Sequence, residues 1–225
     1  MNEFQIKKEY IKIISECQKE FENNLKNKKI IFIYENKEKT IGKEELFFPT
    51  ASFYHLTGIK AYDSNNKELN SYNFYNLLKN NGINASKIKI KDQTTYYKLQ
   101  VLPQLMKIDK TANMIGNFTE DALFLQTDKI VGNVNACMGF VKNQKSNIYI
   151  PNTALKKDIR DITQERKKIV AILKKDINDK LYSNVTYLKQ NYLISNILKN
   201  KYIEKIINRN GLHSFDKKIK LFQDG

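Results

Sequence analysis

Short apolar runs, spaced about ten residues apart and separated by turn-forming residues, constrain the fold of this chain more than any other feature. They occupy the stretch from Met114 to Ile150, and each run is too short for a typical helix. Such a pattern predicts an antiparallel meander, in which each strand pairs with the next one along the chain. The runs are Ile115 with Phe118, 123–125, 130–131, 138–141 and 148–150.

Other segments have the period of an amphipathic helix or the composition of a strand. A polar turn at 35–39 follows the strand predicted at 29–34 and favours a hairpin. Helices are predicted at 4–25, at 69–78 with its end at 80–82, at 94–108 with Pro103 inside it, and at 193–208 with Gly211 as its cap. Further strands are predicted at 29–34, 169–173 and 182–188.

Together these segments predict an α+β fold, with an antiparallel meander sheet flanked by an N-terminal and a C-terminal helix. The length of 225 residues suits one domain, and neither repeats nor long linkers interrupt it. We expect residues 1–45 to form an N-terminal helix and strand extension and residues 46–210 to form the main domain. A charged tail, 211–225, follows.

A formal net charge of +15 predicts a polyanionic partner, and RNA is the expected one. The positive charge comes almost entirely from lysine, because arginine occurs only at Arg160, Arg166 and Arg209. The chain is also rich in Asn and Ile, as AT-rich codons would make it. A lysine-coated surface without a nucleic-acid role is therefore the alternative.

Several classes of function lack their sequence signals. Neither G-x-x-x-x-G-K-[ST] nor G-x-G-x-x-G occurs, so no nucleotide cofactor is expected. Two histidines and two separated cysteines are too few for a zinc site, and we expect neither a metal nor another cofactor. No apolar run is long enough to cross a membrane, and unpaired cysteines suit a cytoplasmic protein.

The segment 53–58, Phe-Tyr-His-Leu-Thr-Gly, contains His55, which can transfer protons near neutral pH. Gly58 permits a turn that would leave His55 and Thr57 at the rim of the sheet. The alternative is a histidine that is hydrogen-bonded in the core.

Lys98 follows two threonines and two tyrosines at the start of a predicted helix, where it can bind a phosphate beside free helix amides. The alternative is a solvated lysine behind an ordinary threonine cap.

Two further segments lie at predicted strand ends. Residues 127–129, Thr-Asp-Lys, separate two apolar runs, and residues 151–153, Pro-Asn-Thr, follow the run at 148–150. Strand ends often carry catalytic side chains, but both segments also suit ordinary turns. If the protein cleaves phosphodiesters, a metal-free route through the 2′-OH of RNA is expected, because it needs only side chains of these types.

In this order, Phe-Tyr-His-Leu-Thr-Gly, Thr-Thr-Tyr-Tyr-Lys-Leu (94–99), Leu-Gln-Thr-Asp-Lys (125–129) and Tyr-Ile-Pro-Asn-Thr-Ala-Leu (149–155) resemble a known family. It is the fourth phage-associated subgroup of the Barnase–EndoU–colicin–RelE-like nucleases, over about residues 46–205. The resemblance implies a helix-flanked, four-stranded antiparallel meander, metal-independent cleavage of RNA, and residence on phages or other mobile elements.

On the matching positions, the resemblance implies that His55 is the general acid or base and that Lys98 binds the phosphate or the transition state. Thr57 and Thr153 would contact phosphate through their hydroxyl groups, and Asn152 would position the substrate.

Tyr54, Thr127, Lys129 and Arg160 complete the expected substrate-binding set. Nucleases of this superfamily often use arginine at the active site, so it matters whether Arg160 reaches His55.

The leading hypothesis is therefore an endoribonuclease of a phage or mobile element that acts in bacterial conflict, as a toxin or in counter-defence. The alternative is a non-catalytic phage-encoded inhibitor of an RNA-guided (CRISPR) defence effector. Such an inhibitor would bind the ribonucleoprotein effector through its protein or its guide RNA.

Overall fold

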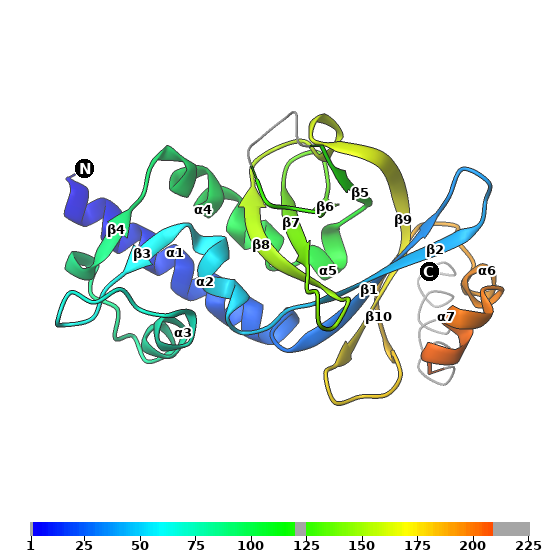
Figure 1. The fold of residues 1–225 in the computed structure, drawn as a ribbon, viewed down its shortest axis with the longest axis horizontal. Helices are drawn as coiled ribbons and strands as arrows, with labels where there is room; N and C mark the ends of the chain where they lie inside the picture. Colours follow the sequence, from blue (N-terminus) through cyan, green and yellow to red (C-terminus); the bar gives the residue numbers. More distant parts are fainter. Residues whose placement is uncertain (1, 120–124, 209–225) are drawn as a thin grey trace, which may run out of the picture.

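The computed structural model describes residues 2–119 and 125–208. Figure 1 shows three parts: a helical end with a small two-stranded sheet, a ring of strands in the middle, and two short helices beyond the ring. The helices are α1 (Glu3–Asn24), α2 (Ser52–Thr57), α3 (Ser71–Lys79), α4 (Gln93–Leu105), α5 (Ile108–Thr111), α6 (Ile194–Leu198) and α7 (Lys201–Ile206). The strands are β1 (Lys28–Glu35), β2 (Ile41–Phe47), β3 (Ile59–Ala61), β4 (Ile88–Ile90), β5 (Met114–Phe118), β6 (Lys129–Gly132), β7 (Cys137–Lys142), β8 (Tyr149–Leu155), β9 (Thr163–Asp176) and β10 (Asn184–Leu188).

The expected meander is present as β5, β6, β7 and β8, each antiparallel to the next. The α+β class is thus confirmed. The apolar run at 123–125 falls mainly in 120–124, outside the described residues.

The predicted antiparallel meander is part of a larger sheet that is closed and mixed. Its order is β1-β2-β8-β7-β6-β5-β9, β9 pairs back with β1, and β10 joins β9 from outside the ring. The pairing of β2 with β8 is parallel, through Leu46 and Tyr149. Residues 30–33 of β1 are fully buried, as expected for a strand with both faces covered. Ile30 and Phe32 belong to one core cluster and Ile31 and Ile33 to another, so the two faces of β1 pack against different parts of the molecule.

Closure of the ring crosses the boundary expected between residues 45 and 46. β1 and β2, assigned to the N-terminal extension, pair with β9 and β8 of the main domain. The extension and the main domain therefore share one sheet and its hydrophobic core.

The N-terminal helix follows its sequence signals, and the C-terminal one does not. Asn2 caps α1 in a capping box with Gln5. The single helix predicted at 193–208 is wrong, because the segment forms α6 and α7. Lys199 is the C-cap of α6, and Asn200 caps α7, accepting hydrogen bonds from the backbone amides of Tyr202 and Ile203. Gly211, the cap predicted for a single helix at 193–208, lies outside the described residues.

A buried ion pair joins α5 to β9 inside the molecule. Lys174 Nζ lies 2.6 Å from Asp109 Oδ2 and also donates to the backbone carbonyl of Asn24, at 3.0 Å. Asp109 is fully buried and Lys174 is 8% exposed. The pair thus fastens the C-terminal end of α1 and the helix α5 to the longest strand of the ring.

We expect Asp109→Ala to lower the free energy of unfolding by about 3–5 kcal/mol, because it leaves the Lys174 charge buried without its partner. The double variant Asp109→Leu with Lys174→Met should recover most of this loss, since no charge then stays in the core. Urea unfolding followed by circular dichroism measures both. Equal destabilisation in the single and double variants would contradict the assignment.

Candidate active site

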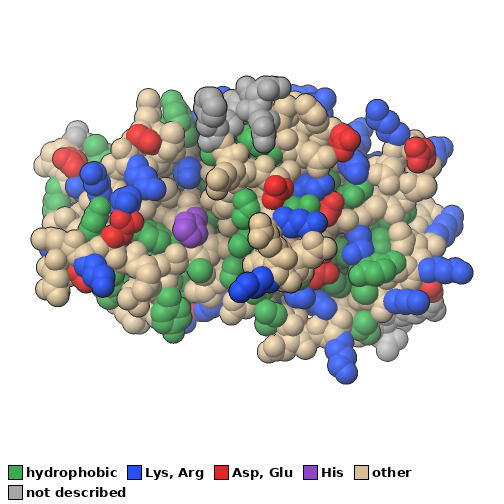
Figure 2. Space-filling model, viewed as in Figure 1, with side chains coloured by type: hydrophobic (Ala, Val, Ile, Leu, Met, Phe, Trp, Pro, Cys, Tyr) green, Lys and Arg blue, Asp and Glu red, His purple; other side chains and the backbone are tan. Residues whose placement is uncertain are grey.

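An open groove of about 560 Å³ lies where α2, β3 and the N-terminal ends of α3 and α4 meet. α2 supplies Tyr54 and His55, α4 supplies Thr94 and Lys98, and Asn152 enters from β8. Four of the nine residues singled out from the sequence therefore line one groove. In Figure 2 the purple histidine lies at the surface of this face, with lysine or arginine side chains around it.

His55 points outward because of the way α2 packs. Phe53 and Leu56 on either side of it are fully buried, whereas the His55 side chain is exposed. The alternative of a core histidine is therefore wrong. Partial desolvation in the groove, and then the positive charges of Lys91 and Lys98, lower the pKa of His55 below its ordinary 6.5. This shift favours the neutral imidazole at neutral pH.

Gly58 brings Lys98 to the groove. It ends α2 with a left-handed φ of +73°, a conformation that glycine adopts without strain. Its carbonyl accepts a hydrogen bond of 2.9 Å from the Thr95 hydroxyl on α4. A Cβ at Gly58 would lie 2.8 Å from Cδ of Lys98, so the lysine stem passes directly over the glycine.

The ammonium group of Lys98 is partly removed from water. Desolvation, and then the charge of Lys91, lower the pKa of Lys98, while Asp92 opposes the shift. At least one of the helix amides expected beside Lys98 is not free. Asp92 caps α4, and its Oδ1 accepts the amide of Thr94 at 2.8 Å.

Asn152 lies inside β8, not after it as the sequence predicted. Gly139 of β7 pairs with Thr153 and Phe140 pairs with Pro151, so Asn152 is the extra residue of a β-bulge. Its side-chain amide donates to the carbonyl of Gln126, and its Oδ1 accepts the Thr127 hydroxyl at 3.2 Å. Thr127 is therefore a support for Asn152 and does not itself line the groove.

Two expected phosphate contacts are wrong. Thr57 is fully buried, and its hydroxyl donates to the carbonyl of Tyr54 at 2.8 Å. Thr153 is 4% exposed and packs against Gly139. Tyr54 lines the groove, but its hydroxyl accepts the amide of Ala61 at 2.7 Å and so positions β3.

Lys129 and Arg160 also lie away from the groove. On β6, Lys129 contacts Glu44 at 3.2 Å and Asn117 at 2.6 Å. Arg160 forms an ion pair of 2.6 Å with Asp158. Among the described residues, no arginine lines the groove.

Sequence reasoning missed the lysines that β3 and β4 supply. Lys60 lies on β3 and pairs with Glu68 at 2.6 Å, and Lys91 follows β4. Both line the groove. Lysine and isoleucine alternate through 87–91 with the period of a strand, a signal that points to β4.

Within 2–119 and 125–208, no three His, Cys, Asp or Glu side chains gather closely enough to hold a metal ion. No helix in the same ranges has the length and apolar character needed to cross a membrane.

Comparison with known protein families gives a match. The model of the family described as phage-Barnase-EndoU-ColicinE5/D-RelE like nuclease 4 matches residues 13–191. This span begins within α1, well before the residue 46 expected from the motifs, and includes the ring and all the groove residues. Neither the curated proteins nor the solved structures give a match. Because the matched span covers most of the chain, the protein belongs to the phage-Barnase-EndoU-ColicinE5/D-RelE like nuclease 4 family.

Proposed function

We propose that this protein is a metal-independent endoribonuclease whose active site is the groove at His55 and Lys98. The observation that carries the proposal is that an imidazole and an ammonium group, from separate helices, line one open groove of about 560 Å³. Membership in a phage nuclease family supports the reaction class. The excess of lysine over carboxylate along the groove walls supports an anionic substrate.

In the proposed reaction, neutral His55 takes the proton of an RNA 2′-OH, whose oxygen attacks the adjacent phosphorus. The bond from phosphorus to the 5′-oxygen then breaks, and a 2′,3′-cyclic phosphate forms. Lys98 stabilises the negative charge on the phosphorane oxygens. The imidazolium formed in the first step is a stronger acid than the ammonium group, so it returns the proton to the departing 5′-oxygen.

The lysines at the groove entrance would hold the neighbouring phosphates. Lys91 lies near enough to lower the pKa of both His55 and Lys98. An RNA phosphate placed among these three groups would offset their mutual repulsion. In a phage or mobile element, such an activity would serve as a toxin or in counter-defence.

One observation favours a second candidate, the non-catalytic inhibitor of an RNA-guided defence effector. Arg160 is held by Asp158 away from the groove, so lysine alone supplies the positive charge there among the described residues. A groove of this kind can also bind guide RNA without cleaving it.

The purified protein should cleave RNA in the presence of EDTA and leave 2′,3′-cyclic phosphate ends. His55→Ala should reduce the rate by about 10²-fold or more, because it removes the general base. Gel electrophoresis with analysis of the RNA ends measures both. Lys98→Met should also slow cleavage, whereas Lys180→Met, an exposed lysine in the loop between β9 and β10, is the matched control and should not.

Undiminished cleavage by His55→Ala would remove His55 from the mechanism. Tight RNA binding without cleavage by the unmodified protein would instead support the inhibitor. In that case log affinity should fall linearly with log salt.

Cleavage should decline as the pH falls through the pKa of His55, because only the neutral imidazole accepts the proton. Since that pKa is lowered, the midpoint of the decline should lie below pH 6.5. Lys91→Gln should move the decline to higher pH, because it removes a positive charge that disfavours the imidazolium.

NMR titration of the His55 ring, assigned through its absence in His55→Ala, measures the same shift independently of activity. Lys180→Gln is the control and should leave the titration where it is. An unchanged midpoint in Lys91→Gln would contradict the electrostatic coupling.

A further inference from the structure

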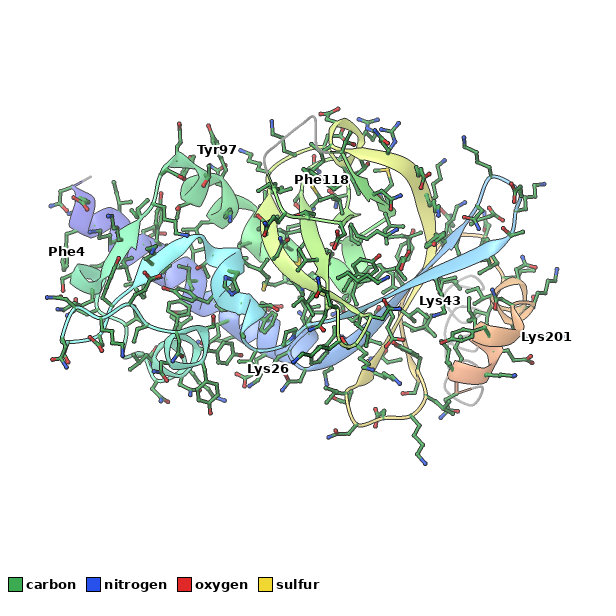
Figure 3. The ribbon with its side chains drawn as sticks, viewed as in Figure 1. Phe4, Lys26, Lys43, Tyr97, Phe118 and Lys201 are labelled. Carbon is green, nitrogen blue, oxygen red and sulfur yellow. The ribbon has the colours of Figure 1, made fainter. Side chains whose placement is uncertain are left out.

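Tyr97 on α4 is an aromatic side chain that the fold leaves in water. It is 42% exposed and lies between the groove residues Thr94 and Lys98 in sequence. Figure 3 shows it on the α4 side of the helical end, away from the ring core. Burial of a tyrosine ring is favourable, so an exposed one beside a basic groove is a candidate contact surface.

Lys156 extends this surface toward the sheet. Its Nζ lies 5.8 Å from the centre of the Tyr97 ring and 2.6 Å from Oε1 of Gln100, one helical turn further along α4. Lys156 directly follows β8, the strand that supplies Asn152 to the groove. Helix α4 and β8, which both supply residues to the groove, pack against each other, and Tyr97 and Lys156 extend from these same two elements.

We propose that the substrate is single-stranded RNA, with one base stacked on Tyr97 and a backbone phosphate bound by Lys156. This inference rests on the proposed function, because it assigns the RNA that the groove at His55 would cleave.

Two physical arguments favour a single strand over a duplex. Stacking on a side chain requires a base that is not already stacked between its neighbours in a helix. An aromatic ring beside a basic groove is also the combination that binds single strands with little sequence preference.

The test compares a labelled single-stranded RNA with the duplex of the same sequence, by fluorescence anisotropy, in the His55→Ala background. The single strand should bind more tightly. Tyr97→Ala should weaken its binding by about 5- to 150-fold, the equivalent of ~1–3 kcal/mol for one stacked base, whereas Tyr97→Phe should retain it.

The matched control is Tyr202→Ala. Tyr202 is another exposed tyrosine, at 57%, with the lysine nitrogen of Lys43 at 4.2 Å from its ring centre. It lies on α7, at the opposite end of the molecule. Its removal should leave RNA affinity unchanged.

Equal affinity for both RNAs, an equal loss in Tyr202→Ala, or no loss in Tyr97→Ala would overturn the inference. Cleavage assays separate this failure from that of the proposed function. If Tyr97→Ala cleaves single strands normally while His55→Ala does not, the nuclease stands and the stacking surface falls. If Tyr97→Ala weakens RNA binding but the unmodified protein cleaves no RNA, the stacking surface is supported and the proposed nuclease activity is contradicted.

Discussion

Closure of the large sheet by the β1–β2 hairpin is the constraint on which the rest of the structure depends. β1 pairs with β9, and β2 runs parallel to β8 from Leu46 and Tyr149. Because the two strands run in the same direction, the segment after β2 continues alongside β8. Helix α2 forms in that segment and packs against β8. His55 and the bulge at Asn152 thus reach the same groove through the register of one strand pair.

Helix α4 completes the site through a second close contact. The glycine at the end of α2 lets α4 approach its backbone, and Lys98 passes across it. The resulting cluster of Lys60, Lys91 and Lys98 is balanced only in part by Glu68. Like charges held together in this way disfavour further protonation. Desolvation, and then the charges of Lys91 and Lys98, therefore lower the pKa of His55, and the cluster favours an anion in the groove.

The sequence allowed much of the local structure to be predicted, because local periodicity determines it. The helix α1, the meander β5–β8 and the strands β9 and β10 follow directly from the spacing of apolar residues. Closure of the ring did not follow, because a parallel pairing between distant strands depends on packing that no local pattern encodes. The broken C-terminal helix escaped prediction because the apolar spacing continues across Asn200, whose capping preference prevailed.

The site was predictable only in its chemistry. His55 and Lys98 were identified because their side chains suit proton transfer and phosphate binding, and the fold brings both to one groove. Thr57 and Thr153 occur in the same motifs, but both are buried. Thr57 lies on the buried side of α2, and Thr153 packs against Gly139. A motif gives the order of residues and not the side on which each one lies. Lys91 was missed because its effect is electrostatic: it lowers the pKa of His55 and of Lys98.

The ring also determines how this protein can associate with copies of itself. Where a strand of the closed sheet is paired on both sides, its amides and carbonyls offer no template to another chain. Within the described residues, the seam between β2 and β8 is joined only at Leu46 and Tyr149. In the described sheet, β10 is paired on one side only, and its register is shifted between Val185 and Tyr187. Irregular edges of this kind resist strand addition. The two-sided pairing of the isoleucine-rich strand β1 thereby disfavours strand addition at its residues.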